Sequence, residues 1–406
     1  MIFGSPLIEQ PEIDEVVATL KSGWIGTGPK VKKFEEDFGA YKKVKHALAV
    51  NSCTAALHLA MRVIGLKKGD EVIIPTMTFA ATANAVIHAG GTPVFADCRR
   101  DTMNIDPKDI ERKITKKTKA IIPVHFAGRP CDMDAIMAIA KKYNLKVIED
   151  CAHAIESEYH GKKTGTFGDV GCFSFYVTKN VVTGEGGMAI TNNDAYAAKI
   201  KTLTLHGMSK DAWKRFGDEG YQHYQVTNPG YKYNMTDIQA SLGIHQLKRI
   251  DQNWNRREEI WNRYNEAFKN LPVFTPAPVE KNTRHAYHLY NFLLDLDKLD
   301  ITRDRFLDEM TKRNIGIGVH YIAVHLQPRY RYNARNESCW RGIARNIMAY
   351  LNPLYQKEFS YKKGDFPNAE WISERTVSIP LSPKLSDQDV NDVIGAVKEI
   401  LDNNRK

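Results

Sequence analysis

The sequence predicts an α/β fold, in which a largely parallel sheet lies between layers of helices. Two patterns support this prediction. Short apolar runs alternate with helical patterns through the first half of the chain, and these runs are apolar on both faces. The size and composition agree, since 406 residues with 43% hydrophobic and 26% charged side chains suit two or three folded domains. A disordered chain, a collagen-like repeat and a disulfide-rich miniprotein are excluded.

The first half of the chain supplies the strands of this sheet and the helices between them. Predicted strands are His46–Val50, Glu71–Pro75, Thr92–Asp97, Ala120–Phe126 and Leu145–Asp150, followed by a sixth apolar run, GCFSFYVTKN, at 171–180. Predicted helices are Thr54–Val63, an alanine-rich stretch ending at His88, and Met133–Tyr143. Another helix begins at Asp106-Pro107, because Asp accepts hydrogen bonds from free amides and Pro suits the first turn.

The last third of the chain has a different pattern. One long helical stretch is predicted over Met235–Phe268, followed by a strand at His288–Leu296 and a helix at Thr302–Lys312. Ser386 and Asp389 form a capping-box pattern that starts a terminal helix. The prediction is therefore a large α/β domain over 1–250 and a smaller α+β domain over 251–406.

Charge, cysteine spacing and the N-terminal residues limit the setting. No apolar stretch is long enough for a membrane span, and residues 1–12 lack a basic and apolar leader, so a cytoplasmic protein without membrane contact is expected. The six cysteines contain no C-x-x-C pair, which favours reduced thiols over disulfides or a structural zinc, and no metal site is predicted. The net charge of +9 suits a phosphate-bearing partner and is weak evidence for nucleic acid.

Polar residues that follow the predicted strands are the candidates for chemistry, because ligands of such sheets bind at the carboxyl ends of strands. No G-x-G-x-x-G or Walker loop is present; Ser52-Cys53-Thr54 follows the first strand instead. This turn into a helix offers amides and hydroxyls to an anion, or is a plain helix cap. Asp150 ends one apolar strand, and Lys179 follows another and precedes a glycine-rich loop, Thr183–Gly187.

Together these features match the needs of pyridoxal phosphate. The cofactor requires a phosphate anchor, an acid that keeps its ring nitrogen protonated, and a lysine that forms a Schiff base. An apolar environment favours the neutral amine of a lysine, which suits attack on a carbonyl. Taken singly, Asp150 and Lys179 also fit ordinary salt-bridged charges at strand ends.

The sequence resembles the DegT/DnrJ/EryC1/StrS sugar aminotransferases, a fold-type I pyridoxal-phosphate group. The resemblance rests on SGWIGTGPKVKKFEEDF (22–38), AVNSCTAALHLA (49–60), PTMTFAATANA (75–85), VIEDCAHA (147–154), GDVGCFSFYVTKNVVTGEGG (168–187) and GYKYNMTDIQASLG (230–243). It implies a mostly parallel seven-stranded sheet, with Lys179 as the Schiff-base lysine and Asp150 as partner of the ring nitrogen. Phe79 would stack on the ring, and Ser52, Thr54 and Ser174 would hold the phosphate.

The resemblance also implies further contacts and a homodimer. Cys53, His153 and Asn234 would contact the cofactor, while Thr27, Glu185, His320 and His325 would lie near the sugar. Many relatives carry Asn where Lys232 stands, and that residue reaches the cofactor phosphate of the neighbouring chain. The active site would therefore be shared between two subunits, although Lys232 also suits a solvent-facing loop tip.

The loop after Lys179 bears on the substrate. Thr183–Gly187 looks like the version found in enzymes that aminate C4 of a nucleotide-linked 4-keto sugar, with L-glutamate as donor and 2-oxoglutarate as product. The chain looks most like the UDP-4-amino-4-deoxy-L-arabinose–oxoglutarate aminotransferase branch, which implies a UDP sugar and a role in lipopolysaccharide or surface polysaccharide biosynthesis. It departs from that branch by a longer stretch between Arg329 and Pro367. Four arginines in it (331, 335, 341, 345) lie among aromatic residues, as in a flap over the nucleotide, a patch for a partner or a plain surface excursion.

The sequence is compatible with other activities to different degrees. The same chemistry at C3, or on a dTDP or GDP sugar, stays open. The sugar 3-dehydratases of the family usually have histidine at the position of Lys179, so the lysine argues against that activity. A regulatory or nucleic-acid-binding protein is a different class, but nothing resembles a recognition helix or a stacking platform. An NAD enzyme is disfavoured, because this chain lacks the glycine fingerprint of such enzymes.

Overall fold

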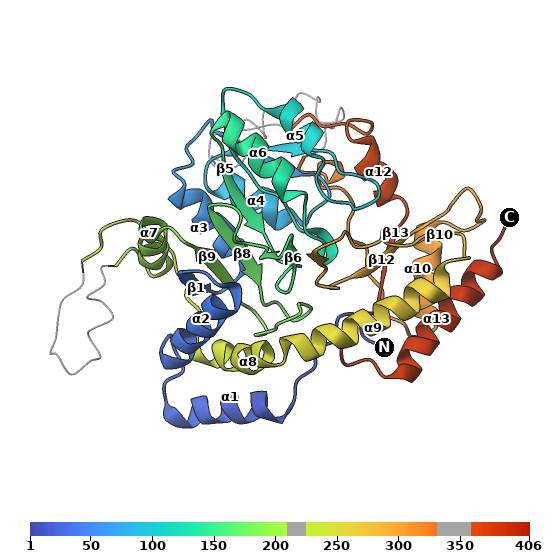
Figure 1. Cartoon of the computed structure of the whole chain (residues 1–406), viewed down its shortest axis with the longest axis horizontal. Helices are drawn as coiled ribbons and strands as arrows, with labels where there is room; N and C mark the ends of the chain where they lie inside the picture. The colour runs from blue at the N-terminus through green and yellow to red at the C-terminus, as the bar shows by residue number, and fades with distance from the viewer. Residues whose placement is uncertain (209–224, 331–358) are drawn as a thin grey trace, which may run out of the picture.

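The computed structural model describes residues 1–208, 225–330 and 359–406 (Figure 1). Seven strands form its largest sheet: β1 (His46–Val50), β2 (Glu71–Pro75), β3 (Thr92–Ala96), β4 (Thr118–Ile121), β5 (Lys146–Asp150), β8 (Val170–Ser174) and β9 (Gly187–Thr191). Eight helices precede or flank it: α1 (Gln10–Ser22), α2 (Pro29–Lys42), α3 (Cys53–Val63), α4 (Ala80–His88), α5 (Pro107–Lys113), α6 (Met133–Tyr143), α7 (Asp194–Thr204) and α8 (Asp237–Lys248).

The large sheet has the strand order β1-β9-β8-β5-β4-β2-β3. Six of its strands run parallel to one another, and β9 runs antiparallel to both of its neighbours, β1 and β8. The predicted α/β class and the seven-stranded, mostly parallel sheet are confirmed. The antiparallel strand β9 was not predicted as a separate element.

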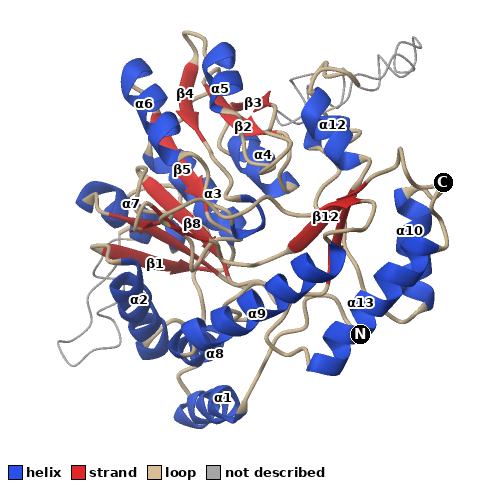
Figure 2. Cartoon of the chain, turned by 45° about the vertical axis from the view of Figure 1, so that its right-hand side comes forward, coloured by secondary structure: helices blue, strands red, loops and turns tan. Residues whose placement is uncertain are grey.

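Both faces of the sheet are buried, and strand alternation explains how. In β2, Val72 and Ile74 pack into the core under α3 and α4, whereas Ile73 packs on the opposite face with residues of α5 and α6. In β8, Cys172 and Phe173 divide in the same way between α3 and α2. Successive side chains point to opposite faces of a strand, so continuous apolar runs need helices on both sides. Figure 2 shows this arrangement.

Most predicted boundaries agree with the structure to within about two residues, and three do not. The sixth apolar run, 171–180, forms a strand only as far as Ser174. The helix at 107–113 begins after the cap Asp106, which accepts a hydrogen bond from Lys108, as predicted. The fourth strand is Thr118–Ile121 instead of Ala120–Phe126, so it starts earlier and stops sooner. The helical stretch predicted over Met235–Phe268 is two helices, because the backbone of Arg249 leaves helical geometry between them.

A second core lies beside the large sheet. It contains α9 (Ile250–Phe268), α10 (Arg303–Lys312), α13 (Asp387–Asp402) and the sheet β10 (Val273–Phe274), β12 (Tyr290–Leu294) and β13 (Thr376–Ile379), in the order β10-β12-β13. The predicted Ser386–Asp389 capping box is present. In Figure 1, α9 extends from the end of α8 toward this core. The division at residues 250 and 251 stays a prediction.

The remaining elements are short. They are a small sheet, ordered β11-β6-β7, of β6 (Glu158–Tyr159), β7 (Lys162–Lys163) and β11 (Thr283–Arg284), and the helix α12 (Pro367–Ser373). Within the described ranges, no helix has the length and apolar character that crossing a membrane requires. All five described cysteines are free and buried. Cys339, the arginines at 331, 335, 341 and 345, and the aromatic residues Tyr332, Trp340 and Tyr350 lie outside the described residues.

Candidate active site

A cavity of about 640 Å³ lies at the carboxyl ends of the parallel strands. The segments around it follow β1, β2, β5 and β8, and residues 318–321 of the C-terminal third complete the wall. Most of the predicted site residues line this one cavity: Ser52, Cys53, Thr54, Phe79, Asp150, His153, Ser174, Lys179, Glu185 and His320. Residues up to 268 positions apart in the sequence, from Ser52 to His320, therefore meet at one place.

Four predicted residues do not line the cavity. Thr27 and Asn234 lie together elsewhere, with 2.7 Å between the Asn234 Nδ2 and the Thr27 Oγ1. Lys232 is exposed. His325 is fully buried, and its two ring nitrogens are bonded to Thr76 and Glu370 at 2.7 and 3.1 Å. The prediction that His325 contacts a sugar is wrong, because the ring has neither a free nitrogen nor an exposed edge.

The N-terminus of α3 forms an anion cradle at one end of the cavity. The Ser52 Oγ accepts the amide of Ala55 at 3.1 Å, and the Ser52 carbonyl accepts that of Ala56. This leaves the amides of Cys53 and Thr54 without an acceptor in the part of the chain that the structure describes. Free amides at the positive end of a helix favour a phosphate. Gly187 makes the cradle compact, because a Cβ there would lie 2.5 Å from the carbonyl carbon of Ser52.

Two adjacent carboxylates end β5, and the first of them is fully satisfied. Glu149 has no exposed surface and accepts the amides of Gly165, Phe167 and Gly168 at 2.7–2.8 Å. The His125 Nε2 donates to it as well, at 3.1 Å. Burial acts to raise the pKa of Glu149, but the bonds from His125 and from these amides outweigh burial and lower the pKa below its ordinary value. Glu149 is thus an ionised anchor for the 165–168 turn.

Asp150 is on the opposite face of the strand and lines the cavity. It is buried and accepts two hydrogen bonds, from the Thr82 hydroxyl at 2.9 Å and the Ala152 amide at 3.2 Å. It forms no ion pair with any described residue. Burial raises the pKa of Asp150 above its ordinary value, although these two bonds act in the other direction. A carboxylate in this state is suited to a cationic ligand group.

Lys179 reaches the same cavity from a turn after β8. The turn is held by the bond from its own amide to the Tyr176 carbonyl, at 2.8 Å, and by the bond from the Phe175 amide to the Gly186 carbonyl, at 2.9 Å. Burial lowers the pKa of Lys179 to about 8, although Cys53 and Asp150 nearby act to raise it. The neutral fraction of this amine near neutral pH is therefore larger than that of an ordinary lysine.

Aromatic side chains form another part of the wall. Phe79 is 62% exposed at the cavity, and its ring lies 6.2 Å from that of Tyr321. His153 accepts the Ala127 amide at Nδ1, at 3.2 Å, so its Nε2 carries the proton and donates to the Tyr321 hydroxyl at 3.1 Å. The pKa of His153 is lowered well below its ordinary value by burial and by nearby Lys179, which keeps the ring neutral.

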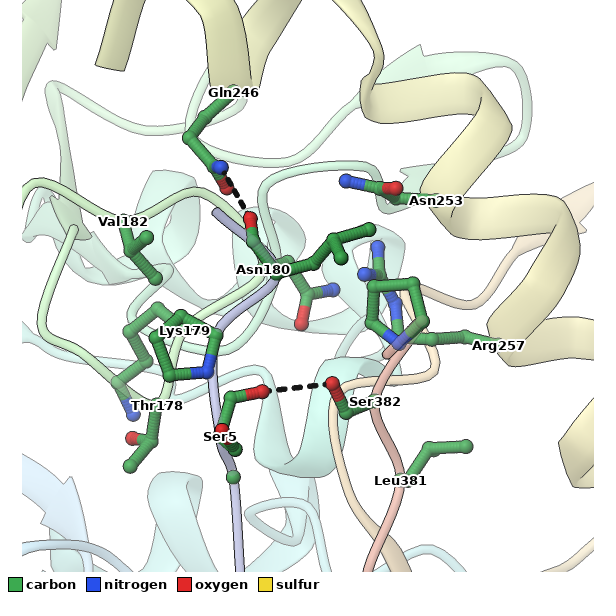
Figure 3. A pocket seen from close by; sticks show the side chains of 14 residues that line it. Ser5, Thr178, Lys179, Asn180, Val182, Gln246, Asn253, Arg257, Leu381 and Ser382 are labelled. Carbon is green, nitrogen blue, oxygen red and sulfur yellow. Dashed lines mark hydrogen bonds between the residues drawn. The ribbon is translucent and has the colours of Figure 1, made fainter. Parts of the chain in front are cut away.

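The N-terminal segment, residues 3–7, lies next to Lys179, and residues 4–7 line a small pocket with it. Figure 3 shows Ser5 beside Ser382, whose hydroxyl donates to the Ser5 carbonyl at 2.8 Å. Gln246 donates to the carbonyl of Leu7, also at 2.8 Å. This segment therefore joins α8 to the C-terminal core on the far side of the lysine, and Phe3 within it lines the cavity.

Sequence reasoning missed several residues of this site. Thr82 holds Asp150, Tyr321 bonds to His153, and Asn180 and His288 lie next to Lys179. Thr82 and Asn180 lie inside motifs that carry the family resemblance (75–85 and 168–187), which is the signal that could have drawn attention to them. Nothing in the pattern around Tyr321 indicates that it bonds to His153.

The two carboxylates of β5 should respond oppositely to loss of charge. Glu149→Gln places an amide group against backbone donors, so we expect the free energy of unfolding to fall by about 2–4 kcal/mol. Asp150→Asn removes a poorly compensated buried charge, so the cofactor-free protein should be as stable as wild type or more so. Denaturant unfolding of the apoproteins measures both effects. Glu111→Gln, at an exposed carboxylate paired with Lys142, is the control; equal losses at 149 and 150 would contradict the distinction.

Comparison with known proteins identifies the family. The DegT/DnrJ/EryC1/StrS aminotransferase family model matches residues 6–349 and 342–398. Protein MJ1066 of Methanocaldococcus jannaschii is 51% identical over 98% of this chain and 97% of its own length. The spore coat polysaccharide biosynthesis protein SpsC of Bacillus subtilis is 48% identical over 98% and 96%.

Among solved structures, the putative sugar aminotransferase Spr1654 of Streptococcus pneumoniae is similar to this chain. Its PMP-form has a TM-score of 0.86 at 33% identity, with 99% of both chains covered, and its PLP-form has a TM-score of 0.85 at 32% identity with the same coverage. The predicted family and fold are confirmed. The chain belongs to the DegT/DnrJ/EryC1/StrS aminotransferase family.

Proposed function

We propose that this protein is a pyridoxal-phosphate-dependent aminotransferase that moves an amino group from L-glutamate to C4 of a nucleotide-linked 4-keto sugar, with a UDP sugar favoured. The observation that carries the proposal is the composition of one cavity. It combines a lysine of lowered pKa, a buried carboxylate without a cationic partner and a helix N-terminus with free amides. These are the three groups that the cofactor needs.

The residues present fit pyridoxal 5′-phosphate. The amides of Cys53 and Thr54, with the hydroxyls of Ser52, Thr54 and Ser174 in the cavity wall, would bind the phosphate. Asp150 would receive the protonated ring nitrogen, which supplies the missing cation. Phe79 and His153 would contact the ring. The PLP- and PMP-forms of Spr1654 support this cofactor, because the two forms carry the aldehyde and the amine that transamination exchanges.

When bound, pyridoxal phosphate carries the amino group between donor and acceptor and withdraws electrons from the reacting carbon. The chain's own residues provide the rest. Lys179 would hold the cofactor through its amine and would also move a proton with that amine, for which a pKa of about 8 is well matched. Asp150 keeps the ring nitrogen protonated, while Thr82 fixes the orientation of that carboxylate. Phe79 and Tyr321 provide an aromatic wall on one side of the cavity.

The substrate proposal rests on the relatives and on one loop. SpsC and Spr1654 are named for polysaccharide biosynthesis and for a sugar substrate, which supports an amino sugar destined for a surface polysaccharide. Glu185 of the Thr183–Gly187 loop and His320 line the cavity and would lie near the sugar. Thr183 is buried and donates to the Glu185 carbonyl at 2.7 Å, which holds the loop in shape. Amination at C3, or of a dTDP or GDP sugar, is the alternative.

A homodimer with shared sites is part of the proposal. Lys232 is exposed in the single chain, and its carbonyl lies near Asn51, close to the phosphate cradle. Its charge would contact the cofactor phosphate of the partner subunit, and Asn234 and Thr27 would lie at the same boundary. A lysine gives a stronger but less directional contact to a phosphate than an amide does.

The covalent attachment point is testable first. Borohydride reduction of the cofactor-loaded protein, followed by peptide mapping, should place the pyridoxyl group on Lys179. Lys179→Ala should still bind the cofactor but lose turnover by at least about 10³-fold, since it lacks both the covalent link and the proton carrier. Lys30→Ala, on a surface helix, serves as control. A label on any other lysine would contradict the proposal that Lys179 is the attachment point.

The substrate is testable by direct competition. With L-glutamate as donor, we expect turnover of a UDP-linked 4-keto sugar to exceed that of dTDP- and GDP-linked 4-keto sugars and of any 3-keto sugar. Mass spectrometry of the products, with 2-oxoglutarate release measured in parallel, reports the position and the rate of amination. Turnover of 3-keto sugars alone would contradict the inference, drawn from the Thr183–Gly187 loop, that the enzyme aminates C4.

The shared site is testable with hybrid dimers. Lys179→Ala and Lys232→Glu chains should each be inactive alone. When they are mixed, one site of each hybrid has both wild-type residues and the other has neither, so about a quarter of wild-type activity should return. Lys248→Glu, mixed in the same way, is the matched control. Normal turnover of the Lys232→Glu homodimer would show that Lys232 belongs to the surface.

A further inference from the structure

A buried ion pair begins a series of hydrogen bonds that ends at Lys179. Arg257 of α9 and Glu156 are both almost without exposed surface, and the Arg257 Nη2 bonds to the Glu156 Oε1. Arg257, Asn180 and Lys179 line one small pocket (Figure 3). A carboxylate that is paired with a guanidinium in this way accepts hydrogen bonds from its other neighbours.

The side-chain amide of Asn180 has one possible orientation. Its Nδ2 lies 2.9–3.1 Å from the two carboxylate oxygens of Glu156 and 2.9 Å from the Ala286 carbonyl. These neighbours are all acceptors, so the amide nitrogen must face them and both of its N–H groups are used. The Asn180 Oδ1, an acceptor, is left facing His288.

Asn180 in turn determines which nitrogen of His288 carries the proton. The His288 Nδ1 lies 3.0 Å from the Asn180 Oδ1 and must donate to it. Burial and the charge of Lys179 lower the pKa of His288 well below its ordinary value, so the ring is neutral. Its Nε2 therefore has a lone pair, and this nitrogen lies 3.5 Å from the Lys179 Nζ.

We propose that His288 is a positioning residue for Lys179, whose amine donates one N–H to the His288 Nε2. With that N–H held on the side away from the cavity, the amine presents its lone pair to the reacting groups. The inference rests on the proposed function of Lys179. It explains why a buried ion pair lies behind the lysine: the pair fixes Asn180, and Asn180 fixes the tautomer of His288.

His153, the neighbouring histidine, cannot accept a hydrogen bond from Lys179. The rings of His153 and His288 lie 4.4 Å apart, but the His153 Nδ1 accepts a backbone amide and its Nε2 donates to Tyr321. His320 bonds to the Ser378 hydroxyl through Nδ1. Among the described residues, His288 alone has a side-chain nitrogen or oxygen within hydrogen-bond distance of the Lys179 Nζ.

Two substitutions separate the two nitrogens of His288. In His288→Asn, the amide takes the place of Nδ1 and keeps the contact with Asn180, but nothing replaces Nε2. In His288→Gln, the longer side chain places an acceptor where Nε2 was. His285→Asn is the matched control, because His285 is equally buried, belongs to the same segment and bonds the Tyr287 amide, away from Lys179.

Two rates are measured. The first is the capture of pyridoxal phosphate by each apoprotein, quenched with borohydride and mapped to Lys179. The second is the single-turnover reaction of the loaded protein with L-glutamate, resolved into a maximal rate and an apparent Kd. We expect His288→Asn to lower both the capture rate and the maximal rate by about 10–100-fold with the apparent Kd within about twofold. His288→Gln and His285→Asn should stay within about threefold of wild type.

Other outcomes overturn the inference. Wild-type rates in His288→Asn, or equal losses in the Asn and Gln variants, would show that the acceptor at Nε2 does not matter. If His288→Asn does not fold, His288→Gln decides, and a loss of more than about tenfold rejects the positioning role. Failure of the proposed function looks different, because the wild-type apoprotein itself would then not capture pyridoxal phosphate at Lys179.

Discussion

The alternation of side chains at the end of β5 is the constraint on which the site depends. Because neighbouring residues of a strand point to opposite faces, Glu149 and Asp150 cannot share an environment. Glu149 takes all of its hydrogen bonds from the 165–168 turn and from His125, and so ties the next strand, β8, to β5. Asp150 is thereby held at the cavity with fewer donors than an ionised carboxylate needs. One position stabilises the fold, and the next is kept available for a ligand.

The rest of the cavity is also made of two parts, one positioned by the sheet and one supplied by other segments. The α3 N-terminus, the turn after β8 and the end of β5 all directly follow or end strands of the sheet, so the anion cradle, Lys179 and Asp150 are fixed relative to one another by the main core. Phe3 and residues 318–321 line the cavity from segments that are not part of the large sheet, although Phe3 and Tyr321 pack against the same core. The polar network behind Lys179 connects the two parts, because Arg257 is on the helix that extends toward the C-terminal core.

Local patterns were enough to predict much of this structure. The strand His46–Val50 and the caps of α5 and α13 follow from short stretches of sequence, and so does the position of Lys179 beyond an apolar strand. The break at Arg249 was missed because helical periodicity continues through it. His325 was placed wrongly, and the contacts of His288 were missed, because hydrogen-bond partners far away in the sequence determine whether a histidine faces a ligand or the core. Periodicity and spacing carry no information about those partners.

One part of the cavity wall follows the strands of the sheet, and the other comes from the N-terminal segment and residues 318–321. This division has a consequence for how such enzymes diversify. Changes in the N-terminal segment or at residues 318–320 alter the shape of the cavity and make no contact with Asp150 or with the N-terminus of α3, which the sheet positions. Substitutions in these segments can therefore change which acceptor fits the cavity while Lys179 and Asp150 keep their positions. A single scaffold of this design can give rise to a broad repertoire of amino sugars from small, separable changes.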